Sequence, residues 1–193
     1  MLQFILSSSS QYSLAESAQM AIEGGCGWIQ YSAQPPCRET ALELMELCRE
    51  NEVIFIIDHD VEMVNELKVS GVHLAKNDMK AQEAREVLGP HAIIGVDVDT
   101  PEEVILLRPA DIDYVVLAPF QEKYSVEDYA KFVSVLEEKG CDMPVVARGN
   151  ITPKDAADLL AVGVKGIAVG SMIADADSPA TAVESYLDLT NRR

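Results

Sequence analysis

Three polar residues follow directly on an apolar run in the first third of the chain. Asp58, His59 and Asp60 come immediately after Ile56 and Ile57, and packing alone does not explain three polar side chains at that point. Because successive side chains of a strand alternate, we expect Asp58 and Asp60 to face one way and His59 the other. These residues are therefore the first candidates for chemistry.

Asp78 lies in the loop after the next predicted strand. In a parallel sheet, its carboxylate and those that follow Ile57 would meet at one edge. One or two carboxylates combined with substrate oxygens are the ligands that Mg²⁺ prefers. The pattern favours a magnesium site at this edge. The alternative is that these are solvated loop acids in a chain with 32 acidic residues.

Two glycine-containing loops follow the last two predicted strands. Gly149 and Asn150 come after one, and Gly170 and Ser171 come after the other, where they open a short helical segment. In parallel β/α barrels these two loops commonly bind phosphate, because small residues let a ligand approach backbone N–H groups. We predict a phosphate site at these four residues. The alternative is that the glycines only make tight turns.

Other polar residues stand at strand ends without a clear motif. Gln30 and Gln34 could bind a polar heterocycle, and Asp97 is expected to face the same mouth. His73 lies within a predicted strand, where it is either a structural core histidine or a catalytic one. Arg148 is either an anion clamp or a surface residue at the rim.

Short apolar runs rich in Val and Ile alternate along the chain with helical patterns. The predicted strands cover residues 3–6, 28–31, 53–57, 71–74, 92–96, 114–117, 144–147 and 166–169. The predicted helices cover residues 14–23, 39–50, 61–68, 81–88, 101–107, 126–139, 153–161 and 180–189. Continuously apolar strands are buried on both faces, as in parallel sheets covered by helices. Eight such pairs predict a single-domain α/β protein, a compact (β/α)8 TIM barrel over residues 1–193, with an open doubly wound sheet as the alternative. The serine run at 7–10 is the predicted first strand-to-helix loop.

Composition excludes several classes of protein. The 15 basic and 32 acidic residues give a formal net charge of −17. Nucleic acids and anionic membranes are bound by clustered Lys and Arg, which the chain lacks, so we expect neither partner. No apolar run is long enough for a transmembrane helix, and the first residues lack the features of a signal peptide. The 4 cysteines, without zinc spacing, indicate reduced thiols in a cytoplasmic protein. The sequence leaves a homo-oligomer possible.

A resemblance to a known family spans nearly the whole chain. The residues that carry it are 55–57, 71–74 with Asp78, 94–96, 113–114, 144–147 and 166–169. It is a resemblance to thiamine phosphate synthase and the related thiazole tautomerase, a family of (β/α)8 barrels. The resemblance implies that hydroxymethylpyrimidine diphosphate is joined to thiazole phosphate with release of pyrophosphate. It also implies Mg²⁺ and protein cations that accept the charge of the leaving group.

Several family positions hold other residue types here. The family motif after the second strand is Gln-x-Arg-x-Lys, and this chain keeps Gln30 but has Ser32 and Gln34 at the two cationic positions. The family serine after the fifth strand becomes Asp97. By position, the resemblance implies substrate-binding roles for Gln30, Ser32, Gln34, Asp58 and Asp97.

The metal and catalytic positions also differ. The resemblance places the metal at Asp78, which is kept, and at His59, where the family has an aspartate. The Thr-x-Thr-Lys loop after the sixth strand is missing, which leaves Lys123 as the candidate replacement for its lysine and His73 as the second catalytic candidate. Pro119 occupies the region where the tautomerase has a histidine, so a tautomerase role is not supported.

Three hypotheses follow from this pattern. The first is a thiamine phosphate synthase-like transferase whose activity is weak or lost, because several cations are missing and Asp97 adds an anion. The second is a non-catalytic relative that binds a small phosphorylated heterocycle at the best-preserved loops, or a protein partner. The third is a repurposed enzyme whose mouth is built from Asp58, His59, Asp60, Asp97 and Arg148.

Overall fold

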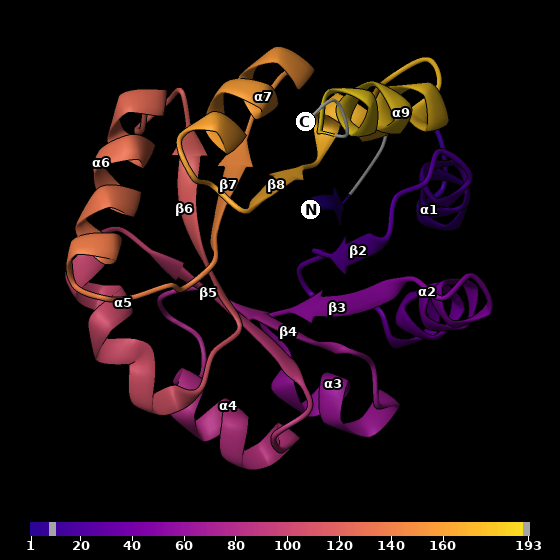
Figure 1. The fold of residues 1–193 in the computed structure, drawn as a ribbon. Helices are drawn as coiled ribbons and strands as arrows, with labels where there is room; N and C mark the ends of the chain where they lie inside the picture. Colours follow the sequence, from indigo (N-terminus) through magenta and orange to yellow (C-terminus); the bar gives the residue numbers. More distant parts are fainter. Residues whose placement is uncertain (8–10, 191–193) are drawn as a thin grey trace.

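The chain folds into a closed barrel of eight parallel strands that follow one another in sequence order (Figure 1). A computed structural model describes residues 1–7 and 11–190, so residues 8–10 of the predicted first loop lie outside the described part. The strands are β1 Leu2–Leu6, β2 Trp28–Tyr31, β3 Ile54–Asp58, β4 Gly71–Leu74, β5 Ile93–Val98, β6 Tyr114–Phe120, β7 Val145–Gly149 and β8 Gly166–Val169. The predicted TIM barrel is confirmed.

Helices alternate with the strands and cover the outside of the barrel (Figure 1). They are α1 Leu14–Glu23, α2 Arg38–Glu50, α3 Val61–Leu67, α4 Ala81–Leu88, α5 Pro101–Leu107, α6 Val126–Glu138, α7 Pro153–Ala161, α8 Ser171–Ala174 and α9 Pro179–Thr190, with a short 3-10 segment at Arg108–Ala110. Local sequence sets their starts: α1, α6 and α7 each begin with a capping box, at Ser13, Ser125 and Thr152. In the described part of the chain, no helix is long and apolar enough to cross a membrane.

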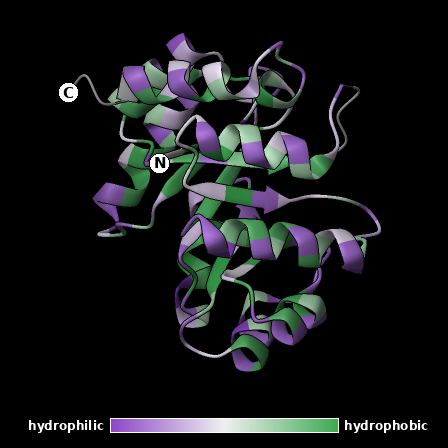
Figure 2. Cartoon of the chain, turned by 90° about the vertical axis from the view of Figure 1, so that its right-hand side faces the viewer, coloured by the Kyte–Doolittle hydropathy of each residue, from purple (hydrophilic) through white to green (hydrophobic). Residues whose placement is uncertain are grey.

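The barrel has two separate apolar cores. Figure 2 shows largely hydrophobic strands at the centre and helices on which hydrophobic and hydrophilic residues alternate. One core lies between the strands and the helices. The other fills the barrel interior and consists of Trp28, Ile56, Tyr114, Val116, Val146 and Ala168. The interior is therefore packed, and polar residues gather at its C-terminal end.

Four strands run further than the apolar pattern predicted. β3 ends at Asp58, β5 at Val98, β6 at Phe120 and β7 at Gly149, one to three residues past the predicted ends. Three of the added residues, Asp58, Asp97 and Arg148, are polar, and their side chains line the cavity at the mouth of the barrel. These extensions place Asp58, Asp97 and Arg148 on strands, where backbone pairing fixes their direction.

Candidate functional site

A cavity of about 300 Å³ opens at the C-terminal ends of the strands. Its walls are formed by Ile5, Gln30, Ser32, Asp58, His59, His73, Ala75, Asp97 and Arg148. Six of these are residues that the sequence singled out for substrate, metal or catalytic roles. The barrel therefore brings together polar side chains from β2 to β5 and from β7, and the volume of the cavity suits a small molecule.

The buried carboxyl group of Asp58 stands at one wall of this cavity. The Gln30 amide donates a hydrogen bond of 2.6 Å to Asp58 Oδ1, and the Asp58 residue is only 4% exposed. Burial raises the pKa of Asp58, although His73 nearby and hydrogen bonds from Ser32 and Gln30 partly oppose it. Burial thus favours the protonated form of Asp58, while its partners favour the carboxylate.

A second hydrogen-bonded chain joins Gln34, His59 and Asp78. Gln34 Nε2 lies 2.7 Å from His59 Nε2, and His59 Nδ1 lies 2.6 Å from Asp78 Oδ2. With the Gln34 amide donating to Nε2, the imidazole carries its proton on Nδ1 and donates it to Asp78. Asp78 Oδ2 also accepts a hydrogen bond of 2.6 Å from the backbone N–H of Ala75.

The expected alternation of side chains after Ile57 is wrong. β3 ends at Asp58, and His59 has a left-handed backbone with φ of 68°. This turn brings His59 to the same cavity as Asp58. Asp60 instead caps α3, where its side chain accepts a hydrogen bond of 2.8 Å from the Met63 N–H. Of the five residues in the third hypothesis, only Asp60 lies outside the cavity wall.

The residues at the predicted metal position do not fit a magnesium ion as they stand. His59 Nδ1 and Asp78 Oδ2 bind one another, so neither atom faces an ion. Mg²⁺ prefers oxygen ligands, and the buried Asp58 already accepts from Gln30. Within residues 1–7 and 11–190, no three His, Cys, Asp or Glu side chains group as metal ligands. We derive no step through a metal.

His73 lies at the centre of a network that crosses the mouth. Its Nε2 is 3.0 Å from Asp97 Oδ1 and 3.2 Å from Arg148 Nη1. Arg148 Nη2 donates to Asp97 Oδ2 at 2.8 Å. On the interior side, His73 Nδ1 is 3.3 Å from the Tyr114 hydroxyl, which also accepts from Gln3 Nε2 at 3.3 Å. Tyr114 therefore donates to Nδ1, and His73 donates its Nε2 proton to Asp97.

This network fixes the charge of Asp97. Burial opposes its ionisation, but the hydrogen bonds from His73 and Arg148 and the charge of Arg148 outweigh burial and lower the pKa of Asp97. Burial raises the pKa of Tyr114 well above its ordinary value. Asp97 is thus a carboxylate at neutral pH, while the Tyr114 hydroxyl keeps its proton.

Lys123 lies away from the cavity wall. Its ammonium group is 2.9 Å from Asp99 Oδ1, and Lys76 is 2.5 Å from the other oxygen of the same carboxylate. Lys76 also contacts Glu103 at 3.1 Å. Hydrogen bonds from Lys76, Lys123 and Tyr124 lower the pKa of Asp99 far below its ordinary range. The predicted catalytic lysine is thus held in an ion-pair cluster at the rim.

The four residues of the predicted phosphate site adjoin the cavity without lining it. A Cβ atom at Gly149, where φ is 149°, would lie 2.8 Å from the Phe120 nitrogen, and one at Gly170 would lie 3.2 Å from the Ile5 carbonyl oxygen. Gly170 and Ser171 open α8, while Asn150 is exposed. Gly149 follows Arg148 directly, and Gly170 lies against Ile5. Both loops are therefore beside the mouth.

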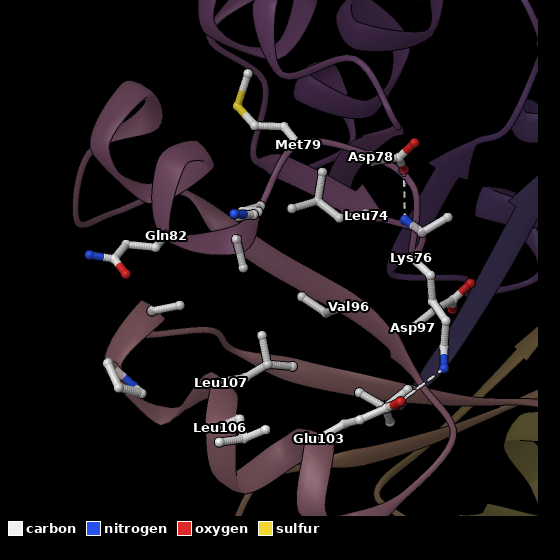
Figure 3. A pocket seen from close by; sticks show the side chains of 16 residues that line it. Leu74, Lys76, Asp78, Met79, Gln82, Val96, Asp97, Glu103, Leu106 and Leu107 are labelled. Carbon is white, nitrogen blue, oxygen red and sulfur yellow. Dashed lines mark hydrogen bonds and ion pairs between the residues drawn. The ribbon is translucent and has the colours of Figure 1, made fainter.

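A larger cavity lies on the outside of the barrel, between α4 and α5. It measures about 490 Å³. Figure 3 shows Leu74, Val96, Leu106 and Leu107 on its apolar walls and the Lys76–Glu103 contact at its polar end. Since its walls are mostly apolar side chains, the polar residues of the mouth make the better candidate for chemistry.

Sequence reasoning missed two members of the network, Gln3 and Tyr114. A signal for Gln3 existed, because it is a polar residue inside an otherwise apolar strand of five residues. The sequence contained no signal for a role of Tyr114 in the network, because tyrosine is common in β-strands. Its position depends on Gly95, where a Cβ atom would lie 2.0 Å from the Tyr114 ring.

Comparisons with known proteins agree with this architecture. The family model described as thiamine monophosphate synthase matches residues 2–173. The thiamine-phosphate synthase of Bacteroides thetaiotaomicron is 39% identical over 97% of this chain and 96% of the relative. That of Bacteroides fragilis is 38% identical over 97% and 98%. A solved structure of thiamine phosphate pyrophosphorylase from Pyrococcus furiosus aligns with a TM-score of 0.85 at 28% identity, over 97% of this chain and 94% of that one. The chain therefore belongs to the thiamine monophosphate synthase family.

Proposed function

We propose that this chain binds a small phosphorylated heterocycle at the mouth of its barrel and has weak or no thiamine phosphate synthase activity. The reaction in question joins hydroxymethylpyrimidine diphosphate to thiazole phosphate and releases pyrophosphate. Membership of the family supports a ligand of this kind. The charge arrangement of the mouth supports the loss of rate.

The observation that carries the proposal is the pairing of the cations near the mouth. Lys76 and Lys123 share the carboxylate of Asp99 at 2.5 and 2.9 Å. Arg148 is 2.8 Å from Asp97. A departing pyrophosphate needs cations that are not already neutralised. Each of these three cations is already neutralised in part by a carboxylate, so each can accept less of the charge of the leaving group.

The second support is the residue content of the loop after β2. Ser32 and Gln34 stand where the family resemblance implies an arginine and a lysine. A charge-assisted hydrogen bond contributes about 1.5–3 kcal/mol. Loss of two such contacts in the transition state costs about 3–6 kcal/mol, or roughly two to four powers of ten in rate at about 1.4 kcal/mol per tenfold.

The ligand-binding half of the proposal is supported by the loops after β7 and β8. In α8, which starts at Ser171 beside the mouth, the N–H groups of Ile173 and Ala174 bond to the Gly170 carbonyl oxygen, so the N–H groups of the first two residues are the candidate donors. Gly149 and Gly170 bring the backbone of both loops close to neighbouring strands. A phosphate bound beside these loops would also lie near Arg148, which directly precedes Gly149, and the rest of the ligand would lie over the polar cavity.

The test is a pyrophosphate-release assay with both substrates and Mg²⁺, run beside the Bacteroides thetaiotaomicron relative. We expect a rate at least about a hundredfold below that relative. Restoring the two cations in a Ser32→Arg, Gln34→Lys double variant should raise the rate. Thiazole phosphate alone should raise the melting temperature of the unaltered chain. A rate equal to that of the relative would contradict the proposal.

A further inference from the structure

The ion pair between Asp97 and Arg148 joins two strands that are not neighbours. Asp97 lies on β5 and Arg148 on β7, with β6 between them. Both side chains face the mouth and are partly exposed, 20% for Asp97 and 28% for Arg148. The pair therefore spans the open end of the barrel within reach of a ligand.

The pair also separates two cavities. Asp97 and Arg148 line the cavity of about 300 Å³ that contains Gln30 and Asp58. The same two residues line a second cavity of about 190 Å³ that contains Lys76 and Asp99. A ligand that enters either cavity meets the Arg148 guanidinium on its way.

Arg148 has donors left for such a ligand. A guanidinium carries five N–H donors, and the described contacts use only Nη2, toward Asp97, and Nη1, which faces His73. Guanidinium groups bind phosphate and carboxylate oxygens through two parallel hydrogen bonds. Arg148 lines the larger cavity, and neither Lys76 nor Lys123 is among its lining residues, so Arg148 is the mouth cation that a ligand there contacts directly.

Asp97 acts against that ligand. It is a carboxylate beside the same guanidinium, and His73 holds its other oxygen at 3.0 Å. An incoming oxyanion meets the repulsion of this fixed negative charge and competes with it for the same cation. An exchange of partners at Arg148 would end the competition and leave Asp97 with its hydrogen bond from His73, but the repulsion between the two anions would remain.

We infer that Arg148 is the contact for the anionic group of the ligand, a phosphate, and that Asp97 is a built-in competitor that weakens phosphate binding at the mouth. The inference deepens the proposed function and rests on it, because it assumes that the mouth takes a phosphorylated ligand. It names the two residues that set the affinity for the anion.

Inorganic phosphate is the probe, and its binding is measured by isothermal titration calorimetry at constant ionic strength. Asp97→Asn keeps an oxygen acceptor for Arg148 and removes the negative charge, so the Kd for phosphate should fall at least about tenfold. Arg148→Gln should abolish binding, and Arg148→Lys should give an intermediate Kd, because it keeps the charge and loses the planar fork.

Two controls change net charge by the same amounts at the opposite end of the barrel. Asp142→Asn and Lys165→Gln alter exposed residues just before β7 and β8. Their phosphate Kd should stay within about twofold of the unaltered chain, given the distance and salt screening. The double variant Asp97→Asn, Arg148→Gln covers the case in which Arg148→Gln alone does not fold, because it leaves no unpaired charge.

The inference is overturned if Asp97→Asn binds phosphate no more tightly than Asp142→Asn, or if the double variant keeps the gain without Arg148. It is also overturned if phosphate binds to none of the variants. The outcome is separable from that of the proposed function. Thiazole phosphate that fails to bind the unaltered chain, together with phosphate that binds Asp97→Asn, would contradict the proposed function and support the inference.

Discussion

The two sides of the barrel mouth are built in different ways. From β3 to β7 the site consists of side chains, and its charged groups are paired: His59 with Asp78, His73 and Arg148 with Asp97. At β7 and β8 the candidate phosphate loops consist of small residues that bring backbone close to backbone. The first side depends on charge balance, and the second depends on backbone conformation.

The difference between charge balance on one side of the mouth and backbone conformation on the other determines which substitutions each side tolerates. Side chains at strand ends can change charge without altering the barrel, provided that an opposite charge compensates, as Arg148 does for Asp97. A residue at Gly149 has no such freedom, because its φ angle and its contact with Phe120 are set by the sheet itself. Breaking a charge pair on the first side and adding a methyl group on the second should therefore fail for different reasons.

The largest effect is expected from Arg148→Gln. It leaves the Asp97 carboxylate, which is 20% exposed, without its cation. Removing one partner of a fully buried ion pair costs about 3–5 kcal/mol, and the partial exposure here reduces this to about 2–3 kcal/mol of unfolding free energy. Urea denaturation at pH 7 measures it.

The double variant Asp97→Asn, Arg148→Gln is the matched control for this prediction. It removes both charges, so it should recover most of the lost stability. Equal losses in the single and double variants would show that Arg148 stabilises the barrel by packing. The mouth would then not be governed by charge balance on this side.

Gly149→Ala tests the other side of the mouth. The new Cβ would lie 2.8 Å from the Phe120 nitrogen at a φ of 149°, which a side chain rarely adopts. We expect a loss of about 1–2 kcal/mol in unfolding free energy. Gly27→Ala is the control, because nothing lies within 4 Å of its Cβ position, and it should change stability by less than about 1 kcal/mol. Equal effects at both glycines would remove the distinction between the two sides.

The sequence was sufficient for the barrel and for most of the mouth. Short apolar runs indicated all eight strands, because a strand that is buried on both faces is continuously apolar, and this pattern can be recognised in a single sequence. Polar residues within or directly after those strands pointed to Gln30, Asp58, His59, His73 and Asp97, which all line the cavity.

What the sequence did not show was how the mouth residues pair with one another. The turn at His59 depends on a left-handed backbone conformation, which no sequence motif around this residue predicts. The Asp97–Arg148 pair joins residues 51 positions apart, and the place of Tyr114 depends on Gly95 on the next strand. Such pairings arise only when the barrel closes and brings distant strands together, so local sequence patterns do not predict them.

The smallest effect is expected from Asp58→Asn, which sharpens the comparison within the side-chain half. Burial raises the pKa of Asp58 in the folded chain, so ionisation of this group costs stability. That cost is absent below the unfolded pKa of about 3.9 and grows as the pH rises through the raised folded pKa. Asparagine is neutral throughout and still accepts from Gln30.

The measurement is the difference in unfolding free energy between Asp58→Asn and the unaltered chain, taken from pH 4 to pH 8. The difference should move in favour of the variant as the pH rises, whatever its offset at pH 4, because only the unaltered chain must ionise a buried acid.

Asp97 should affect stability in the opposite direction. Its pKa is lowered in the folded chain, so the stability that its ionisation contributes is present above the unfolded pKa and is lost as the pH falls. The unfolding free energy of Asp97→Asn, relative to that of the unaltered chain, should therefore fall as the pH rises from 2 to 5. Two carboxylates on one cavity wall that respond to pH in opposite directions would establish that partners, and not exposure alone, decide the charge at this mouth; equal slopes would refute it.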